Sequence, residues 1–131
     1  YEIGVRLVGS EMCIRDRNKD IESNLKLINS ELINFSLESL EEKIDTIVTD
    51  VPEPWDFFEN NIINKDLSWV SYLPSISQVE KISVCLKENN FQNIEIKETL
   101  ERYWIIKENI LRPKNEMVGH TGFIVSGRFI L

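Results

Sequence analysis

Short apolar runs, separated by polar segments, make up most of the chain, and two of these runs predict strands. Residues 44–51 form a β-branched run that stops at Pro52 and Pro54, which indicates a buried strand ending in a loop. Residues 67–73, LSWVSYL, predict a second strand that Pro74 ends. Both runs have the length of strands and are too short for most helices.

The clearest helical pattern lies at residues 77–89. This segment opens with Ser77, a residue type that caps helix N-termini, and stops at Asn89 and Asn90. Its apolar residues recur on one face at helical spacing, namely Val79, Ile82 and Leu86. Residues 55–63 also have helical spacing, so a second, shorter helix is expected there.

The remaining segments complete an alternation of strands and helices. Residues 24–32 alternate as a strand, and residues 36–43 predict a helical or irregular stretch. A strand over residues 91–99 is expected to continue to Ile106, and residues 122–131 predict the last strand. This order predicts an α/β fold with a largely parallel sheet and right-handed crossovers.

The last two strands should pair differently from the others. Residues 108–121 connect them as a polar loop without helical pattern. A parallel connection needs a crossover, usually a helix. We therefore expect the closing pair to be an antiparallel hairpin at the edge of the sheet.

Charge is distributed unevenly along the 131 residues, which carry a net charge of −7. Residues 18–96 hold 6 basic and 15 acidic side chains, whereas residues 97–131 hold 6 basic and 4 acidic ones. A nucleic-acid contact is therefore more plausible on the C-terminal third than on the acidic middle. The basic residues concerned are Arg102, Lys107, Arg112, Lys114 and Arg128.

Glycine placement excludes one kind of ligand site. No glycine occurs between Gly9 and Gly119. Phosphate-cradling loops need glycine where the backbone approaches the ligand, so neither a P-loop nor a dinucleotide-binding turn can lie in that stretch. His120 is the only histidine and no cluster of metal-ligating residues surrounds it, so no metal site is expected.

The first 17 residues connect to no pattern downstream. The string GVRLVGSEMCIRDR resembles translated sequencing-adapter read-through, so we expect residues 1–17 to be non-native and residues 18–131 to be the native part. Cys85 would then be the only native cysteine, which suits a small buried residue in a reducing compartment. Neither a secretory signal nor an apolar run of membrane-spanning length is evident, so a cytoplasmic protein is expected.

The segment DVPEPW, from Asp50 to Trp55, lies where ligands bind in open α/β sheets, beyond the carboxyl end of a strand. Asp50 can accept a hydrogen bond from an exocyclic amine of a flipped-out base, and Trp55 can stack on that base. The alternative is structural, because acid–proline turns often follow strands and a tryptophan that opens a helix is usually part of the core.

Five ordered motifs resemble the C-terminal half of the tRNA (adenine-N1)-methyltransferase family. They are DVPEPW at residues 50–55, YLPSISQV at 72–79, ETLERYW at 98–104, RPKNEM at 112–117 and GHTGF at 119–123. The resemblance implies an incomplete Rossmann-like class I S-adenosylmethionine-dependent methyltransferase fold, the C-terminal half of its sheet, with an antiparallel last strand. It also implies methyl transfer to N1 of the T-loop adenine at tRNA position 58, in archaeal members also 57, by a homotetramer.

Roles for single residues follow from the same resemblance. Asp50 matches the catalytic acidic residue, which would bind the N6 amine of the target adenine and also lies at the cofactor. Tyr72 matches a tyrosine that lines this pocket, and its alternative is an aromatic plug at the strand end. Glu31 matches the position of an acidic residue that contacts the adenine moiety of the cofactor, where the family usually has Asp.

The C-terminal motifs carry further candidates for substrate binding. Arg102, Arg112 and His120 match motif positions where they would contact tRNA phosphate or brace a contact between subunits. His120 alone is more often a hydrogen-bonded loop anchor than a general base.

The family's glycine-rich cofactor loop is missing from this sequence, because it belongs upstream of these motifs. We therefore expect a fragment that neither binds S-adenosylmethionine tightly nor methylates tRNA by itself. One alternative is a non-catalytic methyltransferase-like subunit that binds tRNA or a partner. Another is a related methyltransferase that acts on protein or small molecules.

Overall fold

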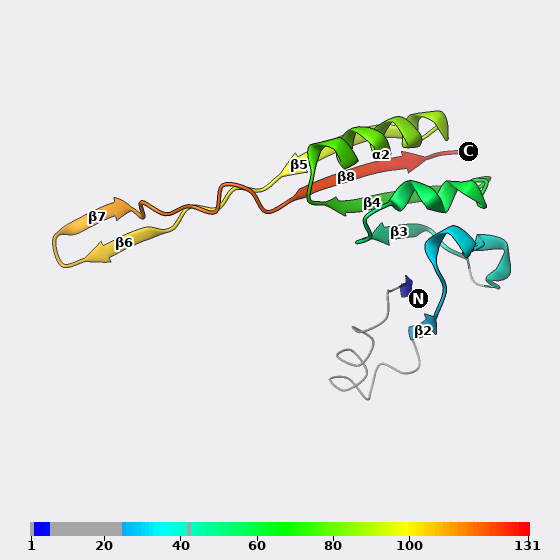
Figure 1. Cartoon of the computed structure of the whole chain (residues 1–131), viewed down its shortest axis with the longest axis horizontal. Helices are drawn as coiled ribbons and strands as arrows, with labels where there is room; N and C mark the ends of the chain where they lie inside the picture. Colours follow the sequence, from blue (N-terminus) through cyan, green and yellow to red (C-terminus); the bar gives the residue numbers. More distant parts are fainter. Residues whose placement is uncertain (1, 6–24, 42) are drawn as a thin grey trace. The chain divides into compact units, whose positions relative to one another are not determined.

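The computed structural model describes residues 2–5, 25–41 and 43–131 of the chain (Figure 1). These residues divide into two compact units. One unit comprises Tyr1–Glu41 and Asp56–Ile62, and the other comprises Glu42–Trp55 and Ile63–Leu131.

The larger unit is built on a four-stranded sheet in the order β3-β4-β8-β5. The strands are β3 (Thr46–Thr49), β4 (Leu67–Leu73), β5 (Gln92–Glu98) and β8 (Phe123–Phe129). β3 pairs with β4 in parallel, whereas β8 pairs antiparallel with both β4 and β5. β3, β4 and β5 therefore run in one direction and β8 runs in the other.

The sheet corrects the expectation of largely parallel pairing. The closing pair is antiparallel as predicted, but β8 lies between β4 and β5, and β5 forms the edge. Two of the three strand pairs are therefore antiparallel. Because the reversed strand β8 lies between β4 and β5, the pairs that it forms with both of them are antiparallel. The local sequence of β8 carries no signal for its place in the sheet.

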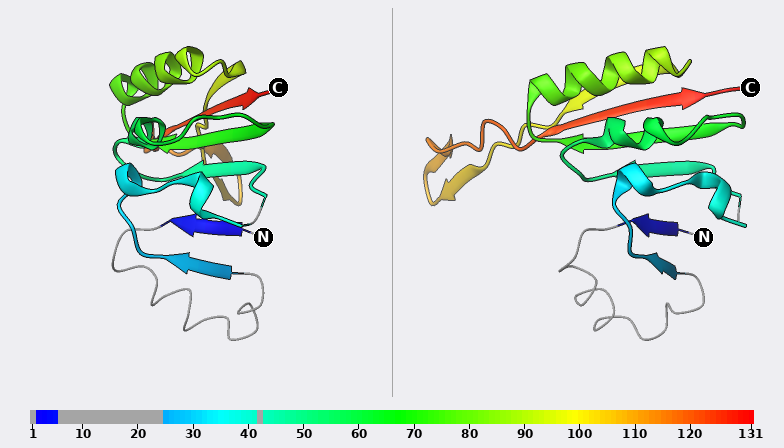
Figure 2. Two further views of the ribbon diagram at one scale, coloured as in Figure 1. Left: turned by 90° about the vertical axis from the view of Figure 1, so that its right-hand side faces the viewer. Right: turned by 45° about the vertical axis from the view of Figure 1, so that its right-hand side comes forward.

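Helix α2 (Ile76–Glu88) connects β4 to β5 and lies along one face of the sheet (Figures 1 and 2). Its N-cap is Ser75, whose hydroxyl accepts from the backbone N–H of Gln78, and not Ser77 as the sequence suggested. Pro74 ends β4 directly before this cap, so the helix begins two residues earlier than expected. Its C-terminal end confirms the prediction, because Asn89 is the C-cap and Asn90 has a positive φ of 62°.

The core lies between α2 and the sheet. The predicted apolar face of the helix is buried, and it meets the alternate residues of β4 and β8 that point to the same side. The fully buried members are Leu67, Trp69, Leu73, Val79, Ile82, Leu86 and Val125. The period-2 burial of β4 and the helical period of α2 thus form one apolar layer.

The chain between β5 and β8 forms a second antiparallel pair, the β6–β7 hairpin, made of β6 (Trp104–Lys107) and β7 (Ile110–Pro113). Two expectations are wrong here. The strand from residue 91 does not continue to 106, because residues 99–103 separate β5 from β6. Residues 108–121 are not only a loop, because they contain β7. Figure 1 shows the hairpin extending away from the ends of β5 and β8.

The smaller unit contains a parallel pair, β1 (Glu2–Val5) with β2 (Leu25–Ile28), and short 3₁₀ turns η1 (Leu32–Asn34) and η2 (Leu37–Ser39). The predicted strand at residues 24–32 is therefore confirmed in shorter form. β1 falls within residues 1–17, whose non-native origin stays a prediction.

The predicted helix at residues 55–63 is instead a 3₁₀ segment, η3 (Pro54–Glu59). Buried Asn61 follows it, donating to the carbonyls of Phe35 at 2.8 Å and Phe57 at 2.7 Å and accepting from the N–H of Leu37 at 2.6 Å. A buried amide that bonds backbone groups ends the segment where an α-helix would need to continue.

No helix in the described part of the chain is long and apolar enough to cross a membrane.

Candidate active site

Asp50 and Tyr72 lie at the carboxyl ends of neighbouring parallel strands. The register pairs Thr49 of β3 with Ser71 of β4, so the next residue along each strand is Asp50 on one and Tyr72 on the other. Both side chains are exposed, Tyr72 by 43%. The structure therefore brings together the two residues that the sequence singled out for the same pocket, at the edge where open α/β sheets bind ligands.

A buried polar network lies directly beneath this pair. The Thr49 and Ser71 hydroxyl oxygens are 2.7 Å apart, and the indole N–H of Trp69 donates to the Ser71 hydroxyl at 2.7 Å. Thr49 and Ser71 are both buried. Hydrogen bonds in a buried setting hold their partners in a defined geometry, so this network fixes the strand ends that carry Asp50 and Tyr72.

Helix α2 holds the turn that begins at Asp50. The side-chain amide of Gln78 donates to the carbonyl of Pro52 at 2.9 Å. Lys81, one helical turn further on, places its Nζ 3.9 Å from the centre of the Trp55 ring. Lys81 therefore covers one face of the Trp55 ring. For that face, the contact favours the structural alternative, in which Trp55 packs within the fold.

The carboxylate of Asp50 is available for a ligand. Asp50 is exposed, and no side chain in the described part of its own unit, residues 43–55 and 63–131, donates to it. An exposed carboxylate accepts hydrogen bonds and donates none. It can therefore bind an amine of a base or of a cofactor.

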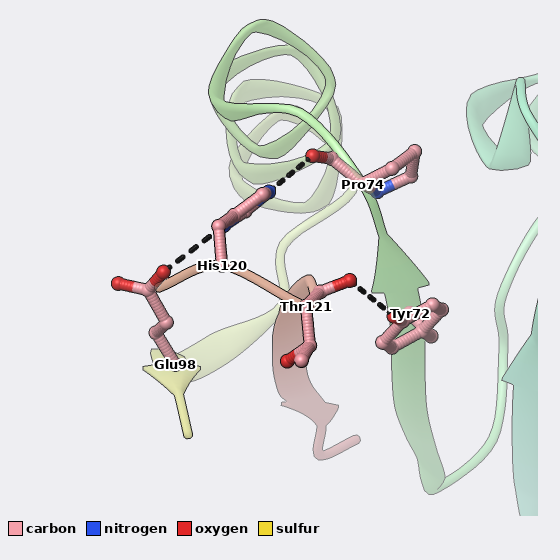
Figure 3. Close-up of polar contacts among 5 residues, drawn as sticks. All are labelled: Tyr72, Pro74, Glu98, His120 and Thr121. Carbon is pink, nitrogen blue, oxygen red and sulfur yellow. Dashed lines mark hydrogen bonds and ion pairs between the residues drawn. The ribbon is translucent and has the colours of Figure 1, made fainter. Parts of the chain in front are cut away.

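Tyr72 is fixed by the segment that precedes β8. Its hydroxyl donates to the carbonyl of Thr121 at 2.5 Å (Figure 3). A Cβ atom on Gly122 would lie 2.5 Å from the Tyr72 ring, and Gly122 has a φ of 158°. Only glycine allows the backbone this close to the ring.

His120 is an anchor between strand ends, the alternative that its isolation in the sequence favoured. Its Nδ1 lies 3.0 Å from Glu98 Oε1, and its Nε2 lies 2.7 Å from the carbonyl oxygen of Pro74 (Figure 3). The hydrogen bond to Glu98, followed by that to Pro74, raises the pKa of the imidazole. Both ring nitrogens are engaged within the chain, so neither is available to tRNA in this conformation.

The two arginine candidates lie on or beside the β6–β7 hairpin. Arg112 in β7 is exposed and donates to the Asn115 side chain at 3.0 Å. Arg102 is exposed and immediately precedes Tyr103, whose hydroxyl pKa is raised by its hydrogen bond to Glu101. Lys114 lies 5.5 Å from the centre of the Tyr103 ring. The hairpin thus combines cations with aromatic rings.

Glu31 belongs to the smaller unit, at the N-cap position of η1. Its exposed carboxylate accepts from the Asn34 side chain at 3.3 Å. Glu31 stays a prediction as a cofactor contact. Among the described residues, no group of three or more His, Cys, Asp or Glu side chains is placed to hold a metal ion.

Sequence reasoning missed the residues that support the site. Gln78, Lys81 and Glu98 lie within or beside the recognised motifs but carry no chemical signature of their own. Only Gly122 left a signal, because a glycine directly before a strand often marks a close backbone approach. The others are defined by contacts between residues 22 to 26 positions apart in the sequence.

An α/β sheet with one reversed strand is the arrangement expected for S-adenosylmethionine-dependent methyltransferases, and the solved structures that this chain resembles belong to that class. A solved S-adenosylmethionine-dependent O-methyltransferase from Thermotoga maritima matches 82% of the chain with a TM-score of 0.67 and 25% identity, and the match covers 40% of that structure. The chain belongs to the family described as the tRNA methyltransferase complex GCD14 subunit, whose profile matches residues 15–114.

The names of two relatives state which tRNA base those proteins methylate. The tRNA (adenine(57)-N(1)/adenine(58)-N(1))-methyltransferase TrmI of Methanocaldococcus jannaschii is 35% identical over 129 residues, which is 95% of this chain and 46% of the relative. The solved tRNA (m1A58) methyltransferase TrmI of Aquifex aeolicus matches 80% of the chain and is itself covered to 42%, with a TM-score of 0.58 and 25% identity. The chain therefore spans about half the length of the proteins it matches.

Proposed function

We propose that this chain is the C-terminal catalytic part of a tRNA (adenine(57/58)-N1)-methyltransferase that transfers a methyl group from S-adenosylmethionine to N1 of a T-loop adenine. The observation that carries the proposal is the exposed Asp50 carboxylate at the end of β3, next in register to Tyr72. The names of the relatives in Methanocaldococcus jannaschii and Aquifex aeolicus support the substrate.

Asp50 performs the positioning in this mechanism. Its carboxylate accepts a hydrogen bond from the N6 amine of the flipped-out adenine and thereby orients N1. As N1 is methylated the base becomes cationic, and the negative charge of Asp50 stabilises that developing charge. No covalent enzyme intermediate is needed, because the reaction is a single displacement that depends on alignment.

The carboxylates of this chain fit the amine groups of the cofactor. Asp50 is exposed and receives no hydrogen bond from a described side chain of its own unit, and Glu31 is exposed and accepts from the Asn34 amide. Either can accept from the adenine amine of S-adenosylmethionine, which supplies the methyl group on a sulfonium. Because no glycine occurs between Gly9 and Gly119, the glycine-rich part of that site would come from outside this chain.

A homotetramer is part of the proposal, and the β6–β7 hairpin supports it. Large apolar side chains of the hairpin and its flanks are exposed, which marks a surface for protein contact. They are Leu100, Tyr103, Trp104, Ile106, Ile110, Leu111, Met117 and Val118. Light scattering on the complete protein tests this, since tetramers that dissociate on Ile106→Asp and not on Ile62→Asp would locate the contact here.

The tRNA partner and a cytoplasmic location are also proposals. The basic residues Arg102 and Arg112 are exposed on or next to the hairpin, which also carries exposed aromatic residues, and this combination suits phosphates and bases. His120 has both nitrogens engaged, so we propose a supporting role for it and assign direct tRNA contact to the arginines.

The second candidate is a non-catalytic subunit, which the family description as part of a complex favours. Such a subunit would bind tRNA or a catalytic partner without transferring a methyl group. It has no use for an exposed acid at the strand end, so the two functions differ in what Asp50 does.

The decisive experiment places residues 18–131 behind the upstream part of the Methanocaldococcus jannaschii relative and measures methyl transfer from labelled S-adenosylmethionine to tRNA. Asp50→Asn should lower kcat by about 100-fold or more, in line with removal of one preorganised electrostatic group. Asp45→Asn removes an exposed carboxylate at the opposite end of β3 and should leave activity unchanged.

Full activity of Asp50→Asn would contradict the catalytic role. An inactive but tRNA-binding chimera, with upstream cofactor binding intact, would favour the non-catalytic subunit. Methyl transfer to protein and not to tRNA would indicate the remaining alternative, a related methyltransferase that acts on protein or small molecules.

A further inference from the structure

His120 connects three strand ends with one ring. It precedes β8, Glu98 is the last residue of β5, and Pro74 directly follows β4. Its two nitrogens lie 3.0 Å from the Glu98 carboxylate and 2.7 Å from the Pro74 carbonyl oxygen (Figure 3). Since β8 separates β4 from β5 in the sheet, His120 bridges two strands that do not pair with each other.

The two partners of His120 determine its charge. A backbone carbonyl only accepts hydrogen bonds, and so does an ionised carboxylate. A neutral imidazole has one N–H and satisfies only one of them, whereas an imidazolium donates to both. Glu98 is the titratable group that faces the ring. β4 contributes the Pro74 carbonyl, and β8 contributes the ring of Phe123 at 5.0 Å between centres.

The residues after His120 hold Tyr72. The carbonyl of Thr121 accepts from the Tyr72 hydroxyl at 2.5 Å, and Gly122 lies against the ring. The hydroxyl is thus engaged by the backbone of the same chain, while Tyr72 remains 43% exposed. With its hydroxyl engaged, the ring is the part of Tyr72 that is left for a ligand.

We propose that His120, as an imidazolium held by Glu98 and Pro74, is a positioning residue that fixes Tyr72 so that its ring, and not its hydroxyl, faces the target base. The role given to the Tyr72 ring rests on the proposed function. The link from His120 to Tyr72 is independent of that function, because it concerns contacts within the chain. A stacked base uses the π-face of a ring and needs no hydroxyl.

The link is tested by NMR on the 131-residue chain, in which His120 is the only histidine and gives unambiguous imidazole signals. His120 should remain doubly protonated above the ordinary titration point of about pH 6.5, and Tyr72 ring signals should titrate with it. Glu98→Gln should move both titrations to lower pH. Glu95→Gln is the matched control, because that carboxylate also lies on β5 but pairs with Lys97 at 2.7 Å.

A His120 that titrates at its ordinary point, or Tyr72 signals that ignore its titration, would overturn the link. Equal effects of Glu98→Gln and Glu95→Gln would overturn it as well. This arm requires no methyl transfer, so it stays decisive if the proposed function fails.

The role of the ring is tested in the chimera by kcat/KM for tRNA. Tyr72→Phe keeps the ring and loses only the bond to Thr121, so it should cost about 3-fold, whereas Tyr72→Leu should cost at least about 10-fold. Glu98→Gln should move the alkaline fall in kcat/KM to lower pH, and Glu95→Gln should not. A Tyr72→Phe loss as large as that of Tyr72→Leu would show that the hydroxyl does the work and would overturn the proposal.

Discussion

The four-stranded sheet and the β6–β7 hairpin contain the same kinds of apolar residues and bury them very differently. In the sheet, Trp69 and Leu73 are 0% exposed. In the hairpin, Trp104 is 55% exposed and Leu111 is 71% exposed. Figure 1 shows why, since α2 lies along the sheet and no described element lies along the hairpin.

Apolar side chains therefore have different roles in the sheet and in the hairpin. In the sheet they stabilise the fold by leaving water, at roughly 25 cal/mol per Å² of buried area. In the hairpin they contribute little to this chain, because a two-stranded pair is marginal by itself. Their exposure fits an interface with another chain, as the proposed homotetramer requires.

The largest effect on stability should come from truncating a buried leucine of the sheet, and it is compared with the truncation of an exposed leucine of the hairpin. Leu73→Ala removes a fully buried side chain and should lower the free energy of unfolding by about 2–5 kcal/mol. Leu111→Ala removes an exposed one and should change it by less than about 0.5 kcal/mol. Urea titration of both variants measures this, and similar losses for the two would mean that the hairpin belongs to the same core.

A glycine pair tests the packing at the base of the hairpin. A Cβ at Gly122 meets the Tyr72 ring at 2.5 Å, whereas one at Gly119 meets nothing within 4 Å. Gly122→Ala should therefore cost about 1–3 kcal/mol, and Gly119→Ala should be near neutral. The cost of Gly122→Ala should shrink in a Tyr72→Ser background, and a cost that persists unchanged would assign it to the backbone alone.

A smaller loss is expected from the polar network within the sheet. Ser71→Ala removes the hydroxyl that accepts from Trp69 and bonds Thr49, and should cost about 1–2 kcal/mol. Ser68→Ala, on the other face of β4, is the control and should cost less. Thermal unfolding compares the two variants, and equal shifts in Tm would show that the network adds nothing to ordinary packing.

Stability should also depend on pH through His120. Its pKa is raised in the folded chain by Glu98 and Pro74, so the folded state binds this proton more tightly than the unfolded state. The stabilisation is therefore complete below the ordinary value of about 6.5 and is lost as pH rises through the folded value. Unfolding followed from acid to alkaline pH should show this fall in the wild type and not in His120→Gln. A fall of the same size in the variant would assign it to other groups.

The sequence predicted the elements that local pattern controls. β4 occupies residues 67–73 as expected because Pro74 stops it, and α2 buries the three residues that helical spacing selected. The position of β8 between β4 and β5 was not predictable, since it depends on pairing between distant segments. The division of residues 91–106 into β5 and β6 was not predicted either. Both segments have the composition of strands, and the break between them is set by their different partner strands.

The candidate site divides in the same way. Asp50 and Tyr72 were found as motif residues, and parallel pairing of β3 with β4 places them side by side. The partners of His120 could not be found, because Glu98 and Pro74 lie 22 and 46 residues away and a lone histidine gives no hint of two acceptors. Motif resemblance thus selects candidate residues, while the contacts that orient them require the fold.

The smallest effect on stability should come from a charge on the hairpin. Arg112 is exposed and contacts only the Asn115 side chain among the described side-chain bonds, so Arg112→Gln should change the free energy of unfolding by less than about 0.5 kcal/mol. Its effect should appear in tRNA binding by the chimera, where loss of one phosphate contact lowers the salt dependence by about one unit of slope.

Lys43→Gln removes the same charge from an exposed position in the acidic middle of the chain and is the matched control. It should alter neither stability nor the salt dependence of binding. Equal losses of tRNA affinity for the two variants would mean that net charge alone attracts tRNA. A loss confined to Arg112→Gln would instead place the contact on the hairpin, where side chains that contribute little to this fold remain available for a partner.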